Sequence, residues 1–434
     1  MDKQKSITRS KQLHQIGQDL IHRLEQVPCG LQHSQIEMQH QRKKAILSYL
    51  NASEEDWNNW QWQITHRIQT IEALTALLSL TSEQVNEIKT VSEHFRFAIS
   101  PYYFSLIDWR SPENDPIAKM SLPDIRELEK KGVSDPSAEE YTNPAGRIVR
   151  RYPNRVIINI TNCCASFCRH CQRKRIIGSQ DHMISAAELD ASVDYIQNHS
   201  EIHDVLVTGG DALTLSDAQL QQLLCRIRAI PHVKIIRLGS RMPVNLPKRI
   251  TEDLVQILKQ YAPIYINTQF NHPLEVTPEA LNACKLLADS GIVLGNQMVL
   301  LRGINNDKYI VQCLNELLLD MRVRPYYIFH AKDVTGTMHF QTSITEGIDI
   351  YAHLWGNTSG LAIPRYIVSA PQGMGKIEIT QDTRYKKVNG RFHLTTWEGI
   401  PVSVLDFPIE ECEDDDRSAP VSYTHLTLPT KFAV

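Results

Sequence analysis

The sequence predicts an α/β fold, in the form of a partial, open β/α barrel of about six parallel strands. A helical N-terminal region precedes the barrel and a β-rich C-terminal segment follows it. After Arg151, short apolar runs rich in β-branched residues alternate with amphipathic stretches of helical length. This alternation is typical of parallel strands joined by right-handed crossovers, and it leaves the loops at the carboxyl ends of the strands to carry a site.

The N-terminal region, residues 1–110, is expected to be largely helical. Residues 1–45 are polar and predict a frayed or partly helical leader. The segment Ser53-Glu-Glu-Asp opens like a capped helix, and Leu80-Thr-Ser-Glu-Gln-Val predicts a second helix start. Residues 111–150 contain scattered prolines and are expected to wrap around the fold as a linker.

The barrel is expected over residues 151–340. Its predicted strands are 156–160, 204–208, 233–238, 264–268, 293–300 and 324–329, with helices at 186–198, 217–229, 278–290 and 309–321. Residues 341–410 are expected to form the β-rich C-terminal segment. Residues 419–434 lack any periodicity and look like a translated sequencing adapter, so they are expected to be a non-native tail that is not part of the fold.

Composition is that of an ordinary globular protein and excludes several function classes. The 434 residues are 42% hydrophobic and 22% charged, and the net charge of −3 gives no basic footprint for nucleic acid. No run of eighteen apolar residues predicts a membrane span, and the N-terminus does not resemble a signal peptide. Nine cysteines, an odd number, do not suit a secreted disulfide framework, so a reducing cytoplasm is expected.

The stretch Cys164-Ala-Ser-Phe-Cys168-Arg-His-Cys171 follows the first predicted strand and places three thiols within eight residues. Thiolates at this spacing can hold an iron–sulfur cluster or, with a remote fourth ligand, zinc. Three ligands leave one iron of a 4Fe–4S cluster open for chemistry. The C-x3-C-x2-C spacing resembles radical S-adenosylmethionine (SAM) enzymes, in which the open iron chelates SAM. Cys163 has the wrong spacing and is not expected to be a ligand.

Three further motifs lie at or on predicted strands. Thr208-Gly-Gly-Asp211 offers glycines for close backbone approach and a carboxylate for an ammonium group, and it resembles the Gly-Gly-Glu-type SAM motif. Gly239-Ser-Arg241 ends the third predicted strand, and Gly295-Asn-Gln297 lies on the fifth. The resemblance to SAM-binding enzymes implies SAM contacts at Gly209, Gly210, Asp211, Ser240, Arg241 and Gln297.

The segment Ala370-Pro-Gln-Gly-Met-Gly-Lys376 ends a glycine-rich turn with a lysine. Inside a cavity a lysine amine has a lowered pKa and is nucleophilic towards an aldehyde, which suits pyridoxal 5′-phosphate (PLP). Two arginines in Arg151-Tyr-Pro-Asn-Arg155 can bind a phosphate.

Together these motifs resemble the PLP-dependent radical SAM 2,3-aminomutases from about residue 57 to about residue 402. The resemblance implies an isomerase that moves an α-amino group to the β-carbon, with a 4Fe–4S cluster, SAM and PLP as cofactors. It makes Lys376 the catalytic PLP lysine and Arg151, Tyr152 and Arg155 PLP contacts. Arg173 becomes the partner of the substrate α-carboxylate.

The substrate pocket departs from that of the lysine enzymes, which hold the substrate ε-ammonium with two aspartates. The matching positions here are Lys332 and Ser369, and a cation cannot hold an ammonium. The glutamate 2,3-aminomutases resemble this chain more closely, which favours L-glutamate as the substrate. A one-residue slip that brings Asp333 into the pocket would restore the lysine specificity, and that alternative stays open.

The resemblance also implies partners. These are an amino-acid substrate, an electron donor such as flavodoxin or ferredoxin, and further copies of the chain in a homo-oligomer. The C-terminal zinc site of the lysine enzymes is not expected, because Asp307 and a single Cys412 replace its cysteines. A non-catalytic iron–sulfur or zinc protein on the same scaffold is the remaining alternative.

Overall fold

The computed structural model describes residues 3–380, 386–395 and 401–406. Its main sheet has nine strands, which are hydrogen-bonded in chain order. The strands are β1 (Ile148–Tyr152), β2 (Arg155–Thr161), β3 (Asp204–Gly209), β4 (Ile235–Gly239), β5 (Ile264–Thr268), β6 (Val293–Leu300), β7 (Arg324–His330), β8 (Arg365–Ser369) and β9 (Lys376–Ile379). Strands β2 to β8 are parallel, and the edge strands β1 and β9 are antiparallel to their neighbours.

This arrangement confirms the predicted α/β class and the open, mainly parallel barrel. All six predicted strands are present. A seventh parallel strand, β8, comes from the range expected to be the C-terminal segment. Strand β4 begins at Ile235 rather than at residue 233, because its pairing partner β3 begins only at Asp204.

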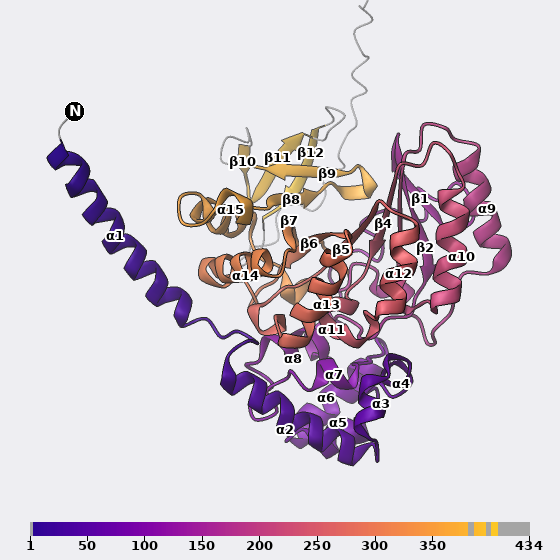
Figure 1. Cartoon of the computed structure of the whole chain (residues 1–434), viewed down its shortest axis with the longest axis horizontal. Coiled ribbons are helices and arrows are strands. Elements are labelled where there is room, and N and C mark those ends of the chain that lie inside the picture. Colours follow the sequence, from indigo (N-terminus) through magenta and orange to yellow (C-terminus); the bar gives the residue numbers. More distant parts are fainter. Residues whose placement is uncertain (1–2, 381–385, 396–400, 407–434) are drawn as a thin grey trace, which may run out of the picture.

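Helices cover the outer face of the parallel strands (Figure 1). They are α9 (Ala186–Gln197), α10 (Asp217–Arg228), α12 (Glu252–Gln260), α13 (Pro278–Asp289), α14 (Lys308–Asp320) and α15 (Ile344–Leu354). The short helix α11 (Met242–Asn245) instead follows the carboxyl end of β4 and contacts α7 (Pro101–Phe104) and α13. Hydroxyl or carboxylate caps such as Ser185, Ser216 and Thr277 start several of them. Leu220 and Leu224 of α10 belong to the same buried core as the strand residues Val205 and Val207.

The N-terminal region is helical, as predicted. It contains α1 (Lys3–Glu25), α2 (His33–Tyr49), α3 (Glu54–Asn58), α4 (Trp60–Thr65), α5 (Ile71–Leu77), α6 (Ser82–Ser92) and α7 (Pro101–Phe104). One more short helix, α8 (Pro116–Ser121), lies within residues 111–150, the segment expected to be a wrapping linker. Both expected helix starts carry capping boxes, at Ser53 and at Thr81. The leader, expected to be frayed or partly helical, is helical for most of its length, although α1 buries no residue and projects from the body (Figure 1).

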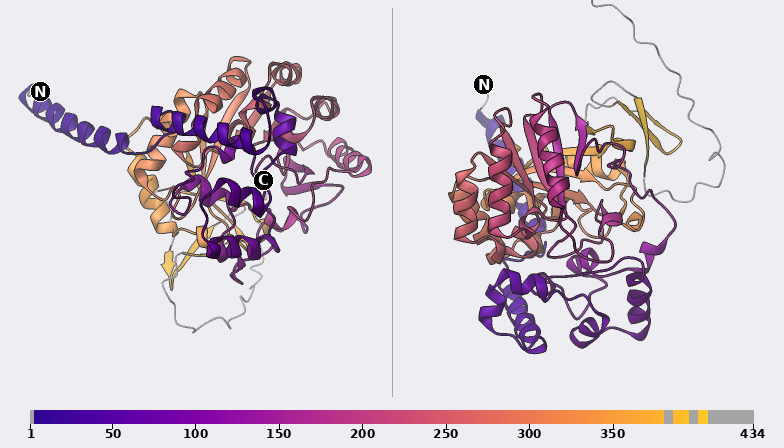
Figure 2. Two further views of the ribbon diagram at one scale, coloured as in Figure 1. Left: turned by 90° about the horizontal axis from the view of Figure 1, so that it is seen from below. Right: turned by 90° about the vertical axis from the view of Figure 1, so that its right-hand side faces the viewer.

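Helices α2 to α8 form a layer beneath the sheet (Figure 2). This layer binds the loop after β2, since the backbone N–H of Phe167 donates to the Ala98 carbonyl at 2.8 Å. The N–H of Arg169 likewise donates to the Met120 carbonyl at 2.9 Å. The N-terminal region therefore fixes the loop that carries the three cysteines.

The C-terminal segment is less uniformly β than predicted, because α15 precedes its strands. Strands β8 and β9 form an antiparallel pair in which Ser369 lies opposite Lys376. A separate antiparallel sheet contains β10 (Lys386–Val388), β11 (Arg391–Thr395) and β12 (Pro401–Leu405). The suspected non-native tail, residues 419–434, lies outside the described residues.

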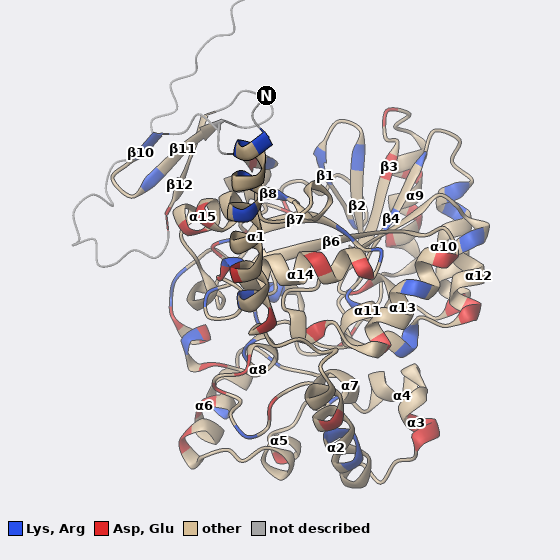
Figure 3. Cartoon of the chain, turned by 60° about the vertical axis from the view of Figure 1, so that its left-hand side comes forward, with Lys and Arg blue, Asp and Glu red and all other residues tan. Residues whose placement is uncertain are grey.

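Short 3-10 helices complete the fold: η1 (Ile125–Leu128), η2 (Lys174–Ile176), η3 (Ala212–Thr214), η4 (Pro247–Arg249), η5 (Pro273–Glu275), η6 (Met338–Phe340), η7 (Gly360–Ala362) and η8 (Pro371–Gly373). Basic and acidic residues are interspersed over the helices that cover the barrel (Figure 3). None of the described helices combines the length and the apolar composition that crossing a membrane requires.

Candidate active site

One cavity at the carboxyl end of the parallel strands brings together nearly all of the predicted site residues. Its lining includes Cys164, Cys168, Cys171, Gly209, Gly210, Asp211, Ser240, Arg241, Gln297, Arg151, Tyr152, Arg173, Lys332, Ser369 and Lys376. Arg155 is the exception. Its guanidinium lies 3.8 Å from the centroid of the Tyr152 ring, outside the lining of this site cavity.

The three cysteines follow β2 on the anchored loop. Burial, followed by the nearby acidic groups, raises the pKa of the Cys164 thiol, and burial also raises that of Cys171. Three buried thiolates repel one another unless positive charge lies between them. The donor set therefore fits an iron–sulfur cluster, which would supply that charge and stabilise the thiolates. Cys163 does not line the cavity, and its sulfur lies 3.3 Å from the Asp181 carboxylate.

The two glycines after β3 let this strand end against the cysteine loop. A Cβ atom on Gly209 would lie 2.4 Å from the Thr161 carbonyl oxygen, and one on Gly210 would lie 2.3 Å from the Cys163 carbonyl oxygen. Both distances are too short for a side chain. The backbone uses this space, since the Asp211 N–H donates to the Cys163 carbonyl at 2.8 Å.

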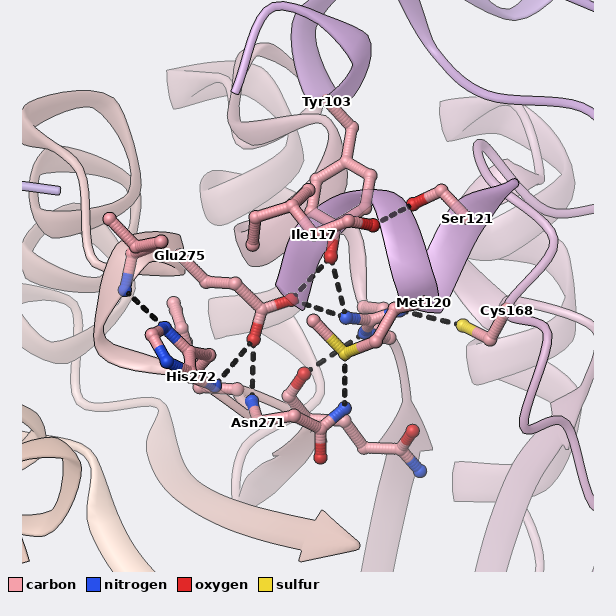
Figure 4. A network of polar contacts seen from close by, with 12 residues as sticks. Tyr103, Ile117, Met120, Ser121, Cys168, Asn271, His272 and Glu275 are labelled. Carbon is pink, nitrogen blue, oxygen red and sulfur yellow. Dashed lines mark hydrogen bonds and ion pairs between the residues drawn. The ribbon is translucent and has the colours of Figure 1, made fainter. Parts of the chain in front are cut away.

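Asp211 and Arg241 connect the strand ends. One carboxylate oxygen of Asp211 accepts the backbone N–H of Arg241 at 2.7 Å, and the other accepts that of Leu213 at 2.9 Å. Nη1 of Arg241 donates to the Cys168 sulfur at 2.6 Å. Nη2 of Arg241 pairs with Glu275, which also accepts a 2.6 Å bond from the Tyr103 hydroxyl (Figure 4). This network fixes a positive charge beside one expected cluster ligand.

Lys376 begins β9 and lies opposite Ser369, with its backbone N–H donating to the Tyr152 hydroxyl at 2.9 Å. Its Nζ lies 4.4 Å from the ring centroid of Tyr327. Burial, followed by the positive charges of Arg237 and Arg151, lowers the pKa of Lys376 to about 7. Near neutral pH a lysine with this pKa has an appreciable uncharged fraction, which can attack an aldehyde.

The arginines around Lys376 fit the phosphate of PLP. Arg151 on β1 and Arg237 on β4 both line the site cavity, and Arg237 is held by a 2.8 Å bond from its Nε to Asp204. Burial lowers the pKa of Arg151, which remains far above neutral as for any guanidinium. The site therefore combines a reactive amine with cations that can bind an anion.

The loop after β7 places Lys332, and not Asp333, in the site cavity. Nζ of Lys332 donates to the Ser137 hydroxyl at 2.7 Å and to the Gln172 side-chain oxygen at 2.6 Å. Burial, followed by the charge of Arg151, lowers the pKa of Lys332 to about 7. Asp333 is exposed and does not line the cavity. The register that would bring Asp333 into the pocket is not the one in the structure.

Arg173 follows Cys171 and pairs with a carboxylate of the protein itself. Its Nε lies 3.1 and 3.0 Å from the two carboxylate oxygens of Glu139, and its Nη2 lies 2.8 Å from one of them. Arg173 lines the site cavity, whereas Glu139 does not. Arg173, the expected partner of the substrate α-carboxylate, is thus held in place by Glu139 on the side away from the cavity.

Sequence reasoning missed several residues of this arrangement. Arg237 carried a usable signal, because a charged residue interrupts the apolar run of β4. Glu139 and Ser137 carried none, since they belong to an irregular segment far from their partners in sequence. Gln172 and Tyr327 stood beside recognised motifs, but their contacts with Lys332 and Lys376 depend on the tertiary fold.

Comparison with known proteins identifies the class first. The model of the Radical SAM superfamily matches residues 158–313, which run from β2 into α14 and include the three cysteines. With the parallel sheet and the cysteine loop at its carboxyl end, the match makes this chain a radical SAM enzyme. Among solved structures, Streptococcus suis SuiB bound to S-adenosylmethionine matches over 51% of each chain, with a TM-score of 0.39 and 12% identity, too remote to bear on the site.

The particular family follows from closer relatives. The chain is 50% identical over 406 residues to the glutamate 2,3-aminomutase of Clostridioides difficile (strain 630), covering 93% of this chain and 95% of the relative. It is 42% identical to the L-lysine 2,3-aminomutases of Fusobacterium nucleatum subsp. nucleatum and Clostridium subterminale, covering 87% and 85% of those relatives and 85% and 81% of this chain. The chain belongs to the family of PLP-dependent radical SAM 2,3-aminomutases, so it is an isomerase whose cofactors are a 4Fe–4S cluster, SAM and PLP.

Proposed function

We propose that the chain is a glutamate 2,3-aminomutase, which converts L-glutamate to β-glutamate by moving the α-amino group to the β-carbon. The observation that supports this most strongly is the position of Lys332, a half-buried cation that lines the site cavity and donates to the neutral oxygens of Ser137 and Gln172. A side-chain carboxylate of the substrate would give this ammonium the anionic partner that it lacks there.

The charge of the cavity wall supports an acidic substrate. Six basic side chains line it, namely Arg151, Arg173, Arg237, Arg241, Lys332 and Lys376. Asp211 is the one carboxylate among the described lining residues, and it is bound to the backbone of Leu213 and Arg241. The ε-ammonium of lysine would meet Lys332 without a carboxylate to hold it, which is unfavourable in a buried site.

The residues divide the work of binding. Arg173 would bind the α-carboxylate of glutamate and Lys332 the γ-carboxylate, so the substrate is held at both ends. Cys164, Cys168 and Cys171 would hold the cluster, and Asp211, Ser240 and Gln297 would contact SAM. Lys376 would hold PLP through its ε-nitrogen while Arg151, Tyr152 and Arg155 support it. When bound, these cofactors supply a 5′-deoxyadenosyl radical and an electron sink for the migrating amino group.

The protein's own contribution is to position the substrate and exclude water. The helical layer beneath the sheet fixes the cysteine loop, and the segment before β1 covers the substrate end through Ser137 and Glu139. Such enclosure protects a primary radical from side reactions. The enzyme needs a reductant for its cluster, and we propose a flavodoxin or ferredoxin, a homo-oligomeric assembly and a reducing cytoplasm, which suits the free cysteines of the described chain.

The test is a product assay. Anaerobically purified, iron-reconstituted protein is incubated with PLP, SAM and dithionite, with L-glutamate and L-lysine in separate reactions. The β-isomers are measured by chromatography, and cleavage of SAM is followed in the same samples. β-Glutamate with little β-lysine is the expected result. β-Lysine as the main product would refute the proposed substrate, and cleavage of SAM without either product would point to a different amino acid.

A further inference from the structure

Glu139 is a buried carboxylate whose close contacts are with the guanidinium of Arg173. It is 5% exposed and Arg173 is 8% exposed. The two side chains meet through three close contacts of 2.8 to 3.1 Å, which involve Nε and Nη2 of the guanidinium. Arg173, followed by more distant cations, lowers the pKa of Glu139 to about 2 against the opposing effect of burial, so Glu139 is ionised at any working pH.

The pairing of Arg173 with Glu139 leaves the Nη end of the guanidinium available to a ligand. A guanidinium can bind two carboxylates, one at the Nε side and one at the Nη end. Within the described residues Nη1 of Arg173 makes no hydrogen bond, and Arg173 lines the site cavity. Glu139 lines a neighbouring second cavity with Arg147, Asn159 and His182 instead. It therefore holds Arg173 from behind and does not occupy the place of the substrate.

Glu139 is itself held by a strap, which we define as residues 133–142. At one end the Val133 N–H donates to the Asp333 carbonyl at 2.7 Å, and at the other the Arg150 N–H donates to the Thr142 carbonyl at 2.9 Å. Between these ends, Asp135 pairs with Arg175 at 3.0 Å. The strap thus connects the loop after β7, which carries Lys332, with the loop after β2, which carries Arg173.

We propose that Glu139 is a positioning residue, which acts through Arg173 by fixing the Nη edge of its guanidinium towards the α-carboxylate of the substrate. The proposal rests on the proposed function, since it assigns Arg173 to that carboxylate. An arginine held by one buried carboxylate loses the freedom to rotate away from its ligand, and a misplacement of about 1 Å in a radical site costs much of the catalytic efficiency.

The experiment compares E139Q with E140Q in the reconstituted holoenzyme. Glu140 is the matched control, because it lies next along the strap and its side chain is 84% exposed. Two probes are used: L-glutamate as substrate, and 4-aminobutyrate, which is glutamate without its α-carboxylate, as a competitive inhibitor. E139Q is expected to raise the KM for glutamate about tenfold while kcat changes less than about threefold, and to leave the inhibition constant of 4-aminobutyrate unchanged within about twofold. E140Q is expected to change neither the glutamate KM nor the inhibition constant of 4-aminobutyrate.

Three results would overturn the proposal. A lower KM for glutamate in E139Q would make Glu139 a competitor of the substrate, and an equal change in the glutamate KM and the inhibition constant of 4-aminobutyrate would indicate a general effect on the cavity. The third is no change in either the glutamate KM or that inhibition constant. If E139Q loses iron or folds poorly, E139D provides the same comparison. We then expect a moderate rise in the glutamate KM. An unchanged ratio of the glutamate KM to the inhibition constant of 4-aminobutyrate would contradict the proposal. Failure of the proposed function is separate, because wild-type protein would then form no β-glutamate.

Discussion

Lys332 is the residue on which the proposed substrate choice depends. Its half-buried ammonium lies near the charges of Arg151 and Arg173 and donates to the neutral oxygens of Ser137 and Gln172. A partly desolvated cation beside other cations, with neutral acceptors, is poorly stabilised, and its lowered pKa reflects that cost. An anion arriving with the substrate removes the cost, so binding selects a substrate with a side-chain carboxylate.

Replacing Lys332 should therefore abolish selection for glutamate. K332M is expected to lower kcat/KM for glutamate about a hundredfold, since it leaves the γ-carboxylate buried without a partner. The variant should still bind PLP and hold its cluster, which absorbance spectra can check. D333N is the matched control, because Asp333 is exposed and outside the cavity, and it should retain kcat/KM within about twofold. A loss in D333N, with K332M active, would mean that the loop takes the other register.

The pKa of Lys332 also sets a pH dependence. The folded-state pKa of about 7 lies below the usual value, so the ammonium is present below pH 7 and is lost as the pH rises above it. Because kcat/KM reports the free enzyme, its value for glutamate should fall about tenfold per pH unit above pH 7. K332R keeps its charge at every working pH, so this fall should disappear from its profile. An unchanged profile in K332R would assign the ionisation elsewhere.

The sequence could predict the location of candidate site residues where a local motif marks them. The three cysteines and Lys376 are marked in this way, and all four line the site cavity, while their roles stay predictions. Pairings between distant segments could not be predicted, such as that of Arg173 with Glu139 across 34 positions. No local pattern records such a contact, because it arises only when the strap folds over the strand ends.

At the scale of elements, the end of β3 approaches the cysteine loop very closely. Gly210 has no room for a side chain, so G210A must push the Cys163 carbonyl and the following cysteines away. We expect G210A to bind clearly less iron on reconstitution while its circular dichroism stays native. Gly360 has nothing within 4 Å and no positive φ, so G360A is the control and should bind iron like the wild type. Full iron binding by G210A would show that the close approach of β3 does not position the cysteine loop.

The elements themselves were predictable to different degrees. Strand–helix alternation gave every parallel strand up to β7, because a buried parallel strand reads as a short apolar run. The role of β8 was harder to predict, since the chain passes through η6 and α15 before it returns to the sheet. The antiparallel return of β9 then places Lys376 opposite Ser369, a register that the glycine-rich turn alone did not specify.

At the scale of the whole molecule, α1 contributes little to the folded body. It buries none of its residues, and Ile16 and Leu13 are half exposed. Deleting residues 1–25 should therefore change the Tm by less than about 2 °C and leave kcat/KM for glutamate intact. Thermal unfolding of both forms at equal concentration measures this. A large fall in Tm would show that α1 is buried in the assembled protein.

The most direct test of the central claim is a competition experiment in which equimolar L-glutamate and L-lysine share one anaerobic reaction with the wild-type holoenzyme. The initial ratio of the two β-amino acids equals the ratio of the two kcat/KM values, free of differences in cluster content. If Lys332 makes the pocket select an acidic side chain, β-glutamate is expected in at least about a hundredfold excess over β-lysine. An equal mixture, or an excess of β-lysine, would contradict the assignment of the cavity to an acidic substrate.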